Sequence, residues 1–220
     1  FPIRRAGIRT VPPCPPAPSL HWSTTMTDLI RPDEGVRVRG LRRVEFEQMV
    51  AQGLFEGEPI ELLGGELVEM SPQGSPHGWA ITRLNAMLAP LMGRGLEVRI
   101  QLPLAVDDVS LPEPDVAVTD VTTPSAHPLV AHAAIEVSVT SQRLDLVHKA
   151  PRYAAAGVPL YVVLDMTRAR AVVHTDPAPE GYTAIEELGP DDTLDVLGEP
   201  IDLALLLSDR WRPDGTRITD

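Results

Sequence analysis

Cysteine and long apolar runs are nearly absent from this chain of 220 residues. Cys14 is the only cysteine, so no internal disulfide can form, and a cysteine-poor chain fits a reducing cytoplasm. No apolar run approaches the roughly 18–20 residues that a membrane-spanning helix needs, so we expect no membrane partner. With 43% hydrophobic and 23% charged residues, the composition predicts one globular domain with a sizeable core.

Lysine is also scarce, and the chain carries a net negative charge. Lys149 is the only lysine, although lysine and arginine together number 19, which makes this compact ammonium group a candidate functional residue. The formal net charge of -12 repels nucleic acid, anionic membranes and free phosphates. Binding of a polyanion would therefore need a bound cation or a local set of arginines, for which the candidates are Arg83, Arg94, Arg143 and Arg152. The sequence has no Gly-rich phosphate loop, CxxC pair or Gly-x-Ser-x-Gly elbow.

The two ends of the chain differ from its middle. Residues 1–25 contain six prolines, three arginines and no acid, and they have no apolar h-region or cleavage pattern of a targeting peptide. We expect a disordered leader there, with Met26 as a natural start. The prediction for the rest is a single domain over residues 26–207 and a tail over residues 208–220.

Hydrophobic spacing predicts a helix, a hairpin and a second helix in the first half of the domain. Residues 42–52 have the pattern of a short amphipathic helix. Two apolar runs flank Gly64 and Gly65, which is typical of a β-hairpin. A helix then begins near Ser75 with a core-facing apolar stripe, and Pro90 and Gly93 end it. Residues 96–106 predict a strand, residues 168–175 and 182–188 a hairpin, and residues 194–207 a strand followed by a short helix.

The stretch over residues 111–165 contains three short apolar runs, and each predicts a strand that meets an acidic residue: Asp115, Glu136 and Asp165. A helix carrying Lys149 lies between the second and third runs. Because proline is tolerated only in the first turn of a helix, Pro151 predicts that this helix begins near residue 147 or 148. The two strands around it should be parallel, and the whole pattern predicts an α/β fold with a mixed sheet.

Asp115 and Glu136 suggest a metal site. If their strands pair, the two carboxylates converge at one end of the sheet. Carboxylate oxygens are ligands that Mg²⁺ and Mn²⁺ prefer. A nearby lysine can orient the attacking water or stabilise developing charge, so the three residues suit phosphodiester hydrolysis. Spacing alone favours a simpler interpretation, because ion pairs also bring acids and bases together.

Four further residues are secondary candidates with two interpretations each. His77 contacts the metal site or substrate, or is a polar residue at a helix start. Glu61 lies among apolar neighbours, although most hairpin acids are solvated. Ser141 caps the following helix, which its position favours, or touches substrate. Asp145 orients Lys149 or begins a turn.

Three segments in order resemble the Uma-type family of restriction endonucleases, within the PD-(D/E)XK nuclease superfamily. The first, PIELLGGELVEMSPQGSPHG, is similar to the family's hairpin and following histidine. EPDVAV is similar to its Pro-Asp motif and supplies Asp115. The longest, IEVSVTSQRLDLVHKAPRYAAAGVPLYVVLD, supplies Glu136, Ser141, Asp145 and Lys149. The resemblance extends over about residues 38–207.

The resemblance implies a restriction-endonuclease-like α/β/α core with an N-terminal helix and β-hairpin. It also implies that Asp115 and Glu136 hold a divalent metal, with the Val137 carbonyl as a third ligand. The superfamily's lysine usually stands two residues after the glutamate, where this chain has Ser138, so Lys149 in the following helix takes that role. Two functions remain open: a Mg²⁺- or Mn²⁺-dependent endonuclease that acts on DNA, and a catalytically silent nuclease-fold module for binding or oligomerisation. A homodimer is one open oligomeric state.

Overall fold

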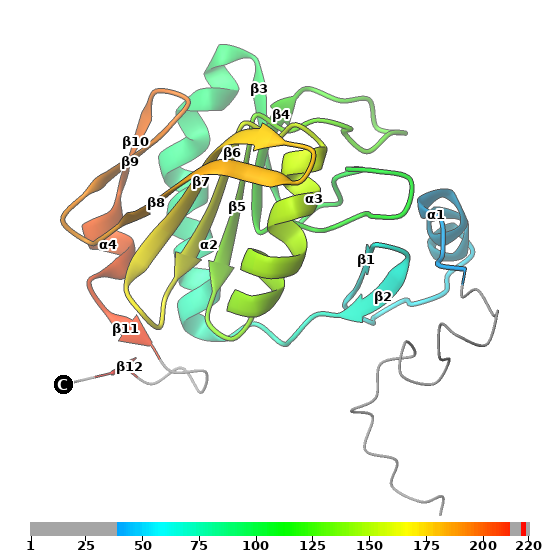
Figure 1. Cartoon of the computed structure of the whole chain (residues 1–220), viewed down its shortest axis with the longest axis horizontal. Helices are drawn as coiled ribbons and strands as arrows, with labels where there is room; N and C mark the ends of the chain where they lie inside the picture. The colour runs from blue at the N-terminus through cyan, green and yellow to red at the C-terminus, as the bar shows by residue number, and fades with distance from the viewer. Residues whose placement is uncertain (1–38, 212–216, 219–220) are drawn as a thin grey trace, which may run out of the picture. The chain divides into compact units, whose positions relative to one another are not determined.

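The computed structural model describes residues 39–211 and 217–218 (Figure 1). They belong to one compact unit, residues 39–220. The predicted leader at residues 1–25 and the start at Met26 lie outside the described residues. Within the predicted tail, β11 (Arg210–Trp211) pairs with β12 (Arg217–Ile218) in an antiparallel ladder, so part of this segment has regular structure.

A six-stranded mixed sheet forms the centre of the unit, in the order β3-β4-β5-β6-β7-β8. Neighbouring strands are antiparallel except for β5 and β6, which are parallel. The parallel pairing predicted around the Lys149 helix is therefore confirmed. The strands are β3 (Leu96–Ile100), β4 (Val116–Asp120), β5 (Ala133–Ser138), β6 (Leu160–Asp165), β7 (Arg170–Ala178) and β8 (Gly181–Leu188).

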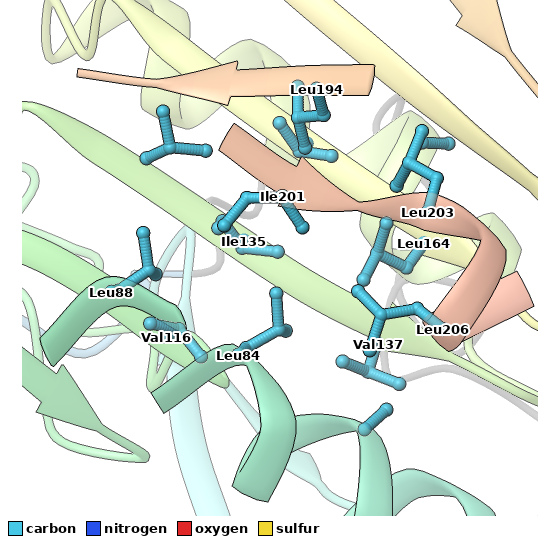
Figure 2. Packing of buried hydrophobic residues seen from close by; sticks show 14 of the residues in the cluster. Leu84, Leu88, Val116, Ile135, Val137, Leu164, Leu194, Ile201, Leu203 and Leu206 are labelled. Carbon is cyan, nitrogen blue, oxygen red and sulfur yellow. The ribbon is translucent and has the colours of Figure 1, made fainter. Parts of the chain in front are cut away.

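Alternation along β5 separates the two faces of the sheet. Ile135 and Val137 point to the face covered by α2 (Ser75–Leu88), where the predicted stripe of Ala80, Leu84 and Leu88 is fully buried. Figure 2 shows Leu84 and Leu88 facing strand residues of this cluster. Ala134 packs on the opposite face, beneath α3 (Ala150–Ala155), in a second core cluster. Because side chains alternate, Glu136 also belongs to the α3 face, so its carboxylate lies within a helix-covered layer.

A π-helix, Leu144–Lys149, precedes α3 and continues directly into it. The prediction that the helical segment begins near residue 147 or 148 is therefore wrong. Pro151 has no N–H to donate, and in a regular helix its ring would clash with a carbonyl of the preceding turn. The wider π-turn before Pro151 relieves this conflict, and insertions of this kind are frequent at functional sites. Lys149 is the last residue of the π-turn.

The hairpin is attached to the segment that leads into β4. β1 (Ile60–Leu63) and β2 (Glu66–Glu69) pair around Gly64 and Gly65, whose φ angles of 62° and 84° favour glycine. Leu62 forms an isolated antiparallel bridge with Leu111, four residues before Asp115. This bridge fixes the neighbouring Glu61 beside the entrance of β4. The predicted helix before the hairpin is α1 (Arg43–Ala51).

A 3₁₀ segment, Ala89–Arg94, ends α2, as Pro90 predicts. The segment over residues 193–207 also packs on the α2 face of the sheet. β9 (Thr193–Val196) and β10 (Glu199–Asp202) form a hairpin that is followed by α4 (Leu203–Leu207). The single strand predicted at the start of residues 194–207 is thus two strands. Gly198, with a φ of 85°, supplies the turn between them.

Candidate active site

The pairing of β4 with β5 brings Asp115 and Glu136 together. Val116 stands opposite Ile135, and one step further along this antiparallel register Asp115 faces Glu136. The Asp115 backbone N–H donates to Glu136 Oε2 at 3.4 Å, and the Val137 N–H donates to Asp115 Oδ2 at 2.7 Å. The two carboxylates therefore share one end of the strand pair, as the sequence predicts.

Two side chains hold Asp115 from the α2 side and the β3 side. His77 Nε2 lies 3.0 Å from Asp115 Oδ2, so the histidine contacts the carboxylate rather than solvent alone. Gln101 Nε2 donates to Asp115 Oδ1 at 3.3 Å, and the Gln101 N–H donates to the Asp115 carbonyl. Gln101 has a φ of 50°, an uncommon backbone conformation for this residue type. The sequence analysis missed Gln101, although a polar residue directly after an apolar strand was a usable signal.

Lys149 is buried between two carboxylates. Its Nζ lies 3.1 Å from Glu136 Oε1 and 3.2 Å from Glu61 Oε2, and the residue is only 4% exposed. The Tyr153 hydroxyl, one helical turn further along, donates to the same Glu136 Oε1 at 3.3 Å. Tyr153 belongs to the same family-like segment as Lys149, but the sequence analysis predicted no contact for it in the site. A residue four positions after the lysine on the same helix was the available signal.

Glu61 is a fully buried member of this group, although hairpin acids are usually solvated. Its Oε2 accepts a hydrogen bond from the Glu113 N–H at 3.1 Å. Its Oε1 is buried and has no hydrogen-bond partner among the described residues. A buried carboxylate oxygen without a donor is costly, because it loses its hydration without replacement. This oxygen is therefore available to a group that the described residues do not supply.

Ser141 and Asp145 form a hydroxyl–carboxylate chain beside the lysine. The Ser141 hydroxyl donates to Asp145 Oδ2 at 2.6 Å and lies 3.2 Å from the Ser138 hydroxyl. Ser141 makes no side-chain bond to a backbone N–H within the described chain, so the favoured capping prediction is wrong. Asp145 is nearly fully buried, and its carbonyl accepts from the Tyr161 hydroxyl. Asp145 is thus part of the packed wall of the site rather than a turn residue.

One cleft contains all the predicted site residues. Its lining includes Glu61, His77, Asp115, Glu136, Val137, Ser141, Asp145 and Lys149. Glu113, the loop between β2 and α2, and the segment that leads from β5 into the π-helix contribute further lining residues. The cleft therefore joins residues from the β1–β2 hairpin, the entrance of β4, strand β5, helix α2 and the π-helix, which are far apart in sequence.

Carboxylates outnumber cations in the cleft, and the pKa shifts reflect this. Burial raises the pKa of Glu136 well above its ordinary value, and the charges of Asp145, Asp115 and Glu61 act in the same direction against Lys149. Burial also raises the pKa of Glu113 and of Asp145. Burial alone would lower the pKa of Lys149, but the carboxylates of Glu136 and Glu61 raise it, so this ammonium stays protonated. The site is therefore an anionic pocket with one fixed positive charge.

The mixed sheet between two helical layers, with its Asp–Glu pair on adjoining strands, defines a restriction-endonuclease-like α/β fold. A solved structure with this fold is the "putative nuclease belonging to DUF820" from Anabaena variabilis ATCC 29413. The two chains share 15% identity with a TM-score of 0.54, and the match covers 68% of this chain and 89% of the other. This likeness supports the fold.

Residues 43–208 match the model of the Uma2 family, described as "Putative restriction endonuclease". The chain belongs to this family, as its motifs predict. No curated protein matches the sequence.

The described residues contain neither a membrane-spanning helix nor a ready-made cluster of metal-binding side chains. No helix there is long and apolar enough to cross a membrane. No group of three or more His, Cys, Asp or Glu side chains in the same part of the chain has an arrangement that could hold a metal ion by itself.

Proposed function

We propose that the protein is a divalent-metal-dependent endonuclease that hydrolyses phosphodiester bonds in DNA. The observation that carries the proposal is the buried contact of Lys149 with Glu136, beside Asp115, in a cleft of a nuclease-family fold. Family membership supports nuclease activity in general. The chemistry of the site supports a divalent metal and a phosphodiester substrate, and the description of the family as restriction endonucleases supports DNA as that substrate.

The donor set fits Mg²⁺ or Mn²⁺. Asp115 and Glu136 would hold the ion together with the Val137 carbonyl, since all three residues line the cleft. Mg²⁺ is usually bound through one or two carboxylates and keeps several waters, so a group of three side chains is not required. The raised pKa values of the cleft carboxylates and the unpartnered Glu61 oxygen both favour an added cation. When bound, the ion supplies the positive charge that neutralises a phosphate in an otherwise anionic cleft.

Lys149 acts as a fixed cation at the reacting phosphate. An ammonium group has three N–H donors, and the two carboxylate contacts leave one of them for a phosphate oxygen or the attacking water. Because its pKa is raised, Lys149 positions and stabilises charge rather than accepting a proton. His77 and Gln101 hold the Asp115 carboxylate in place.

Hydrolysis adds one water across the bond. The water oxygen bonds to phosphorus, and the bond between phosphorus and one sugar oxygen breaks. One water proton leaves to the solvent or to a phosphate oxygen, and the departing sugar oxygen takes up a proton. The protein's contribution to this step is the orientation of the phosphate and water against the preorganised charge of Lys149.

A catalytically silent nuclease-fold module is the second candidate. It is favoured by the net charge of -12 and by the protein hydrogen bonds that already occupy both oxygens of Asp115. Such a scaffold would keep the buried ion pairs for stability and would not need a metal.

Cleavage of supercoiled plasmid DNA separates the two candidates. We expect nicked and linear products with Mg²⁺ or Mn²⁺, none with EDTA, and none from the Glu136→Gln variant. The variant keeps the side-chain shape and controls for a contaminating nuclease. If the wild-type protein leaves single-stranded, duplex and supercoiled DNA intact with both metals, the silent module is the correct function.

A further inference from the structure

One segment beside the cleft contains no acidic residue. Between Glu69 and Glu97 the sequence has no aspartate or glutamate, although the whole chain has 31 of them. This stretch forms the loop after β2, the helix α2 and the 3₁₀ segment Ala89–Arg94. In a chain that repels polyanions overall, its exposed side is a surface on which a phosphate backbone meets little repulsion.

An aromatic ring is exposed on this surface. Trp79 is 38% exposed and is the only aromatic among the exposed large apolar side chains of the described residues. The guanidinium of Arg83, one turn further along α2, lies 5.6 Å from the centre of the Trp79 ring. This cation–π contact favours an arrangement in which the guanidinium lies over one face of the ring. The surface thus combines an exposed aromatic ring with a positive charge.

Arg83 differs from most described arginines because it has no carboxylate partner in the described part of the chain. Of the four arginines that the sequence suggests for phosphate contacts, Arg94 is paired with Glu199 and Arg152 donates to the His148 carbonyl. Arg143, like Arg83, has no carboxylate partner among the described residues. Arg83 contacts Trp79 instead, so its charge is not neutralised by a neighbour. Such a charge is available to a phosphate at little cost in broken ion pairs.

The pair also lies within about two turns of the start of α2, where the helix borders the cleft. Pro76 lines the cleft, and it precedes Trp79 by three residues and Arg83 by seven. Positions i, i+3 and i+7 share one side of a helix. Gln73 and Gly74, which lead into α2, line the cleft as well. A strand that leaves the cleft over this edge would therefore pass along Trp79 and Arg83.

We propose that Trp79 and Arg83 form a stacking site for an unpaired base next to the cleft, with Arg83 contacting the adjoining phosphate. The bases of a duplex are already stacked on one another, so an exposed ring can only take a base that is unpaired. The substrates of the endonuclease would then be DNA with a single-stranded segment, such as a flap, a gap or an open end. This inference rests on the proposed function, because it places the strand in the same cleft.

Equilibrium binding of labelled oligonucleotides, measured by fluorescence anisotropy, tests the site. The full chain is titrated with a single strand and with the corresponding duplex, with Ca²⁺ in place of Mg²⁺, and gels verify that the DNA stays intact. We expect Trp79→Ala to weaken single-strand binding by about 10–100-fold and duplex binding much less, because stacking on one base supplies an affinity of this order. Trp79→Phe, which keeps a flat ring, should retain most of the affinity.

Two further variants sharpen the result. Arg83→Gln should reduce the log–log salt slope for the single strand by about 0.7, the contribution of one phosphate contact. Ile185→Ala, which removes an exposed apolar side chain on β8 at the other edge of the sheet, should bind like the wild type.

Equal single-strand affinity in wild type and Trp79→Ala would overturn the stacking site while leaving the nuclease proposal intact. Equal losses on single strand and duplex would overturn it too, because stacking on an unpaired base requires a difference. If the wild-type protein binds no DNA of either form, both the stacking site and the DNA substrate of the proposed function are wrong.

Discussion

Lys149 Nζ lies 3.1 Å from Glu136 Oε1, although the lysine is on the helix that follows the glutamate's strand. Glu136 points from β5 toward the α3 layer, and the π-turn before Pro151 ends at Lys149, where the ammonium meets that carboxylate. The same ammonium contacts Glu61 from the β1–β2 hairpin at 3.2 Å. A single buried cation therefore links the hairpin, the sheet and the helix. Substitutions of Lys149 or of its carboxylate partners distinguish a catalytic role of this lysine from a structural one.

Lys149→Arg keeps the positive charge and changes its shape. The planar guanidinium is wider than an ammonium and cannot occupy the same point between Glu61 and Glu136. We expect single-turnover DNA cleavage at saturating Mn²⁺ to fall by about 10²–10³-fold, the usual effect of losing one preorganised electrostatic contact. The affinity for Mn²⁺ should change little, because Asp115 and Glu136 remain. A rate equal to that of the wild type would reduce Lys149 to a structural charge.

Glu61→Gln removes one of the two anchors of Lys149 and retains the side-chain shape. Loss of an outer contact of this kind typically costs about 10–100-fold in activity, so we expect cleavage to fall by that factor while Mn²⁺ affinity, measured by calorimetry, is retained. Glu66→Gln on the same hairpin is exposed and serves as the matched control. If cleavage and Mn²⁺ affinity fall together, Glu61 is a metal ligand rather than a residue that positions Lys149.

Asp115→Asn should abolish Mn²⁺ binding in a calorimetric titration and leave the far-ultraviolet circular dichroism unchanged. The amide is nearly isosteric with the carboxylate but lacks the negative charge that attracts the ion. Asp120→Asn is the control, because Asp120 ends the same strand in an exposed position. Unchanged Mn²⁺ affinity in Asp115→Asn would remove this residue from the proposed metal site.

Asp165 should contribute to stability at neutral pH and lose that contribution in acid. Burial alone would raise the pKa of Asp165, but hydrogen bonds from Arg168, Thr167 and Gln142 lower it below its ordinary value. A group whose folded-state pKa is lowered stabilises the fold above its unfolded pKa, about 3.9, and this stabilisation disappears as the pH falls through the folded-state pKa. Acid should therefore weaken the contact between β6 and the turn that follows it.

Urea denaturation of Asp165→Asn measures this contribution. We expect a loss of about 2 kcal/mol at pH 7, the order of a charged hydrogen bond, and a smaller difference from the wild type below about pH 4. The control is Asp191→Asn, an exposed position for which the structure shows no side-chain bond among the described residues. A difference that stays constant between pH 7 and pH 3 would contradict the lowered pKa of Asp165.

Local patterns determined most of the secondary structure correctly. The glycines at 64 and 65 identified the hairpin, because their turn needs a positive φ, and the stripe of α2 identified its buried face. Pro151 led to a wrong predicted start for the Lys149 helix. The expectation that proline lies in the first turn of a helix assumes regular α-helical hydrogen bonds, and the chain has a π-turn there. The hairpin of β9 and β10 has strands as short as those of β1 and β2, but it was missed because its turn is Leu197-Gly198 and lacks a recognisable pair such as Gly-Gly or Asn-Gly.

The sequence by itself determined the residue types of the site, because the single lysine and the acidic residues beside apolar runs can be identified from the order of residues alone. It also placed Asp115 and Glu136 on adjoining strands. Only the tertiary structure decided that Glu61 shares Lys149 with Glu136 and that Gln101 holds Asp115. These contacts join elements whose separation in the chain carries no local signal. They depend on the Leu62–Leu111 bridge and on the β3–β4 register, which form only when the sheet assembles.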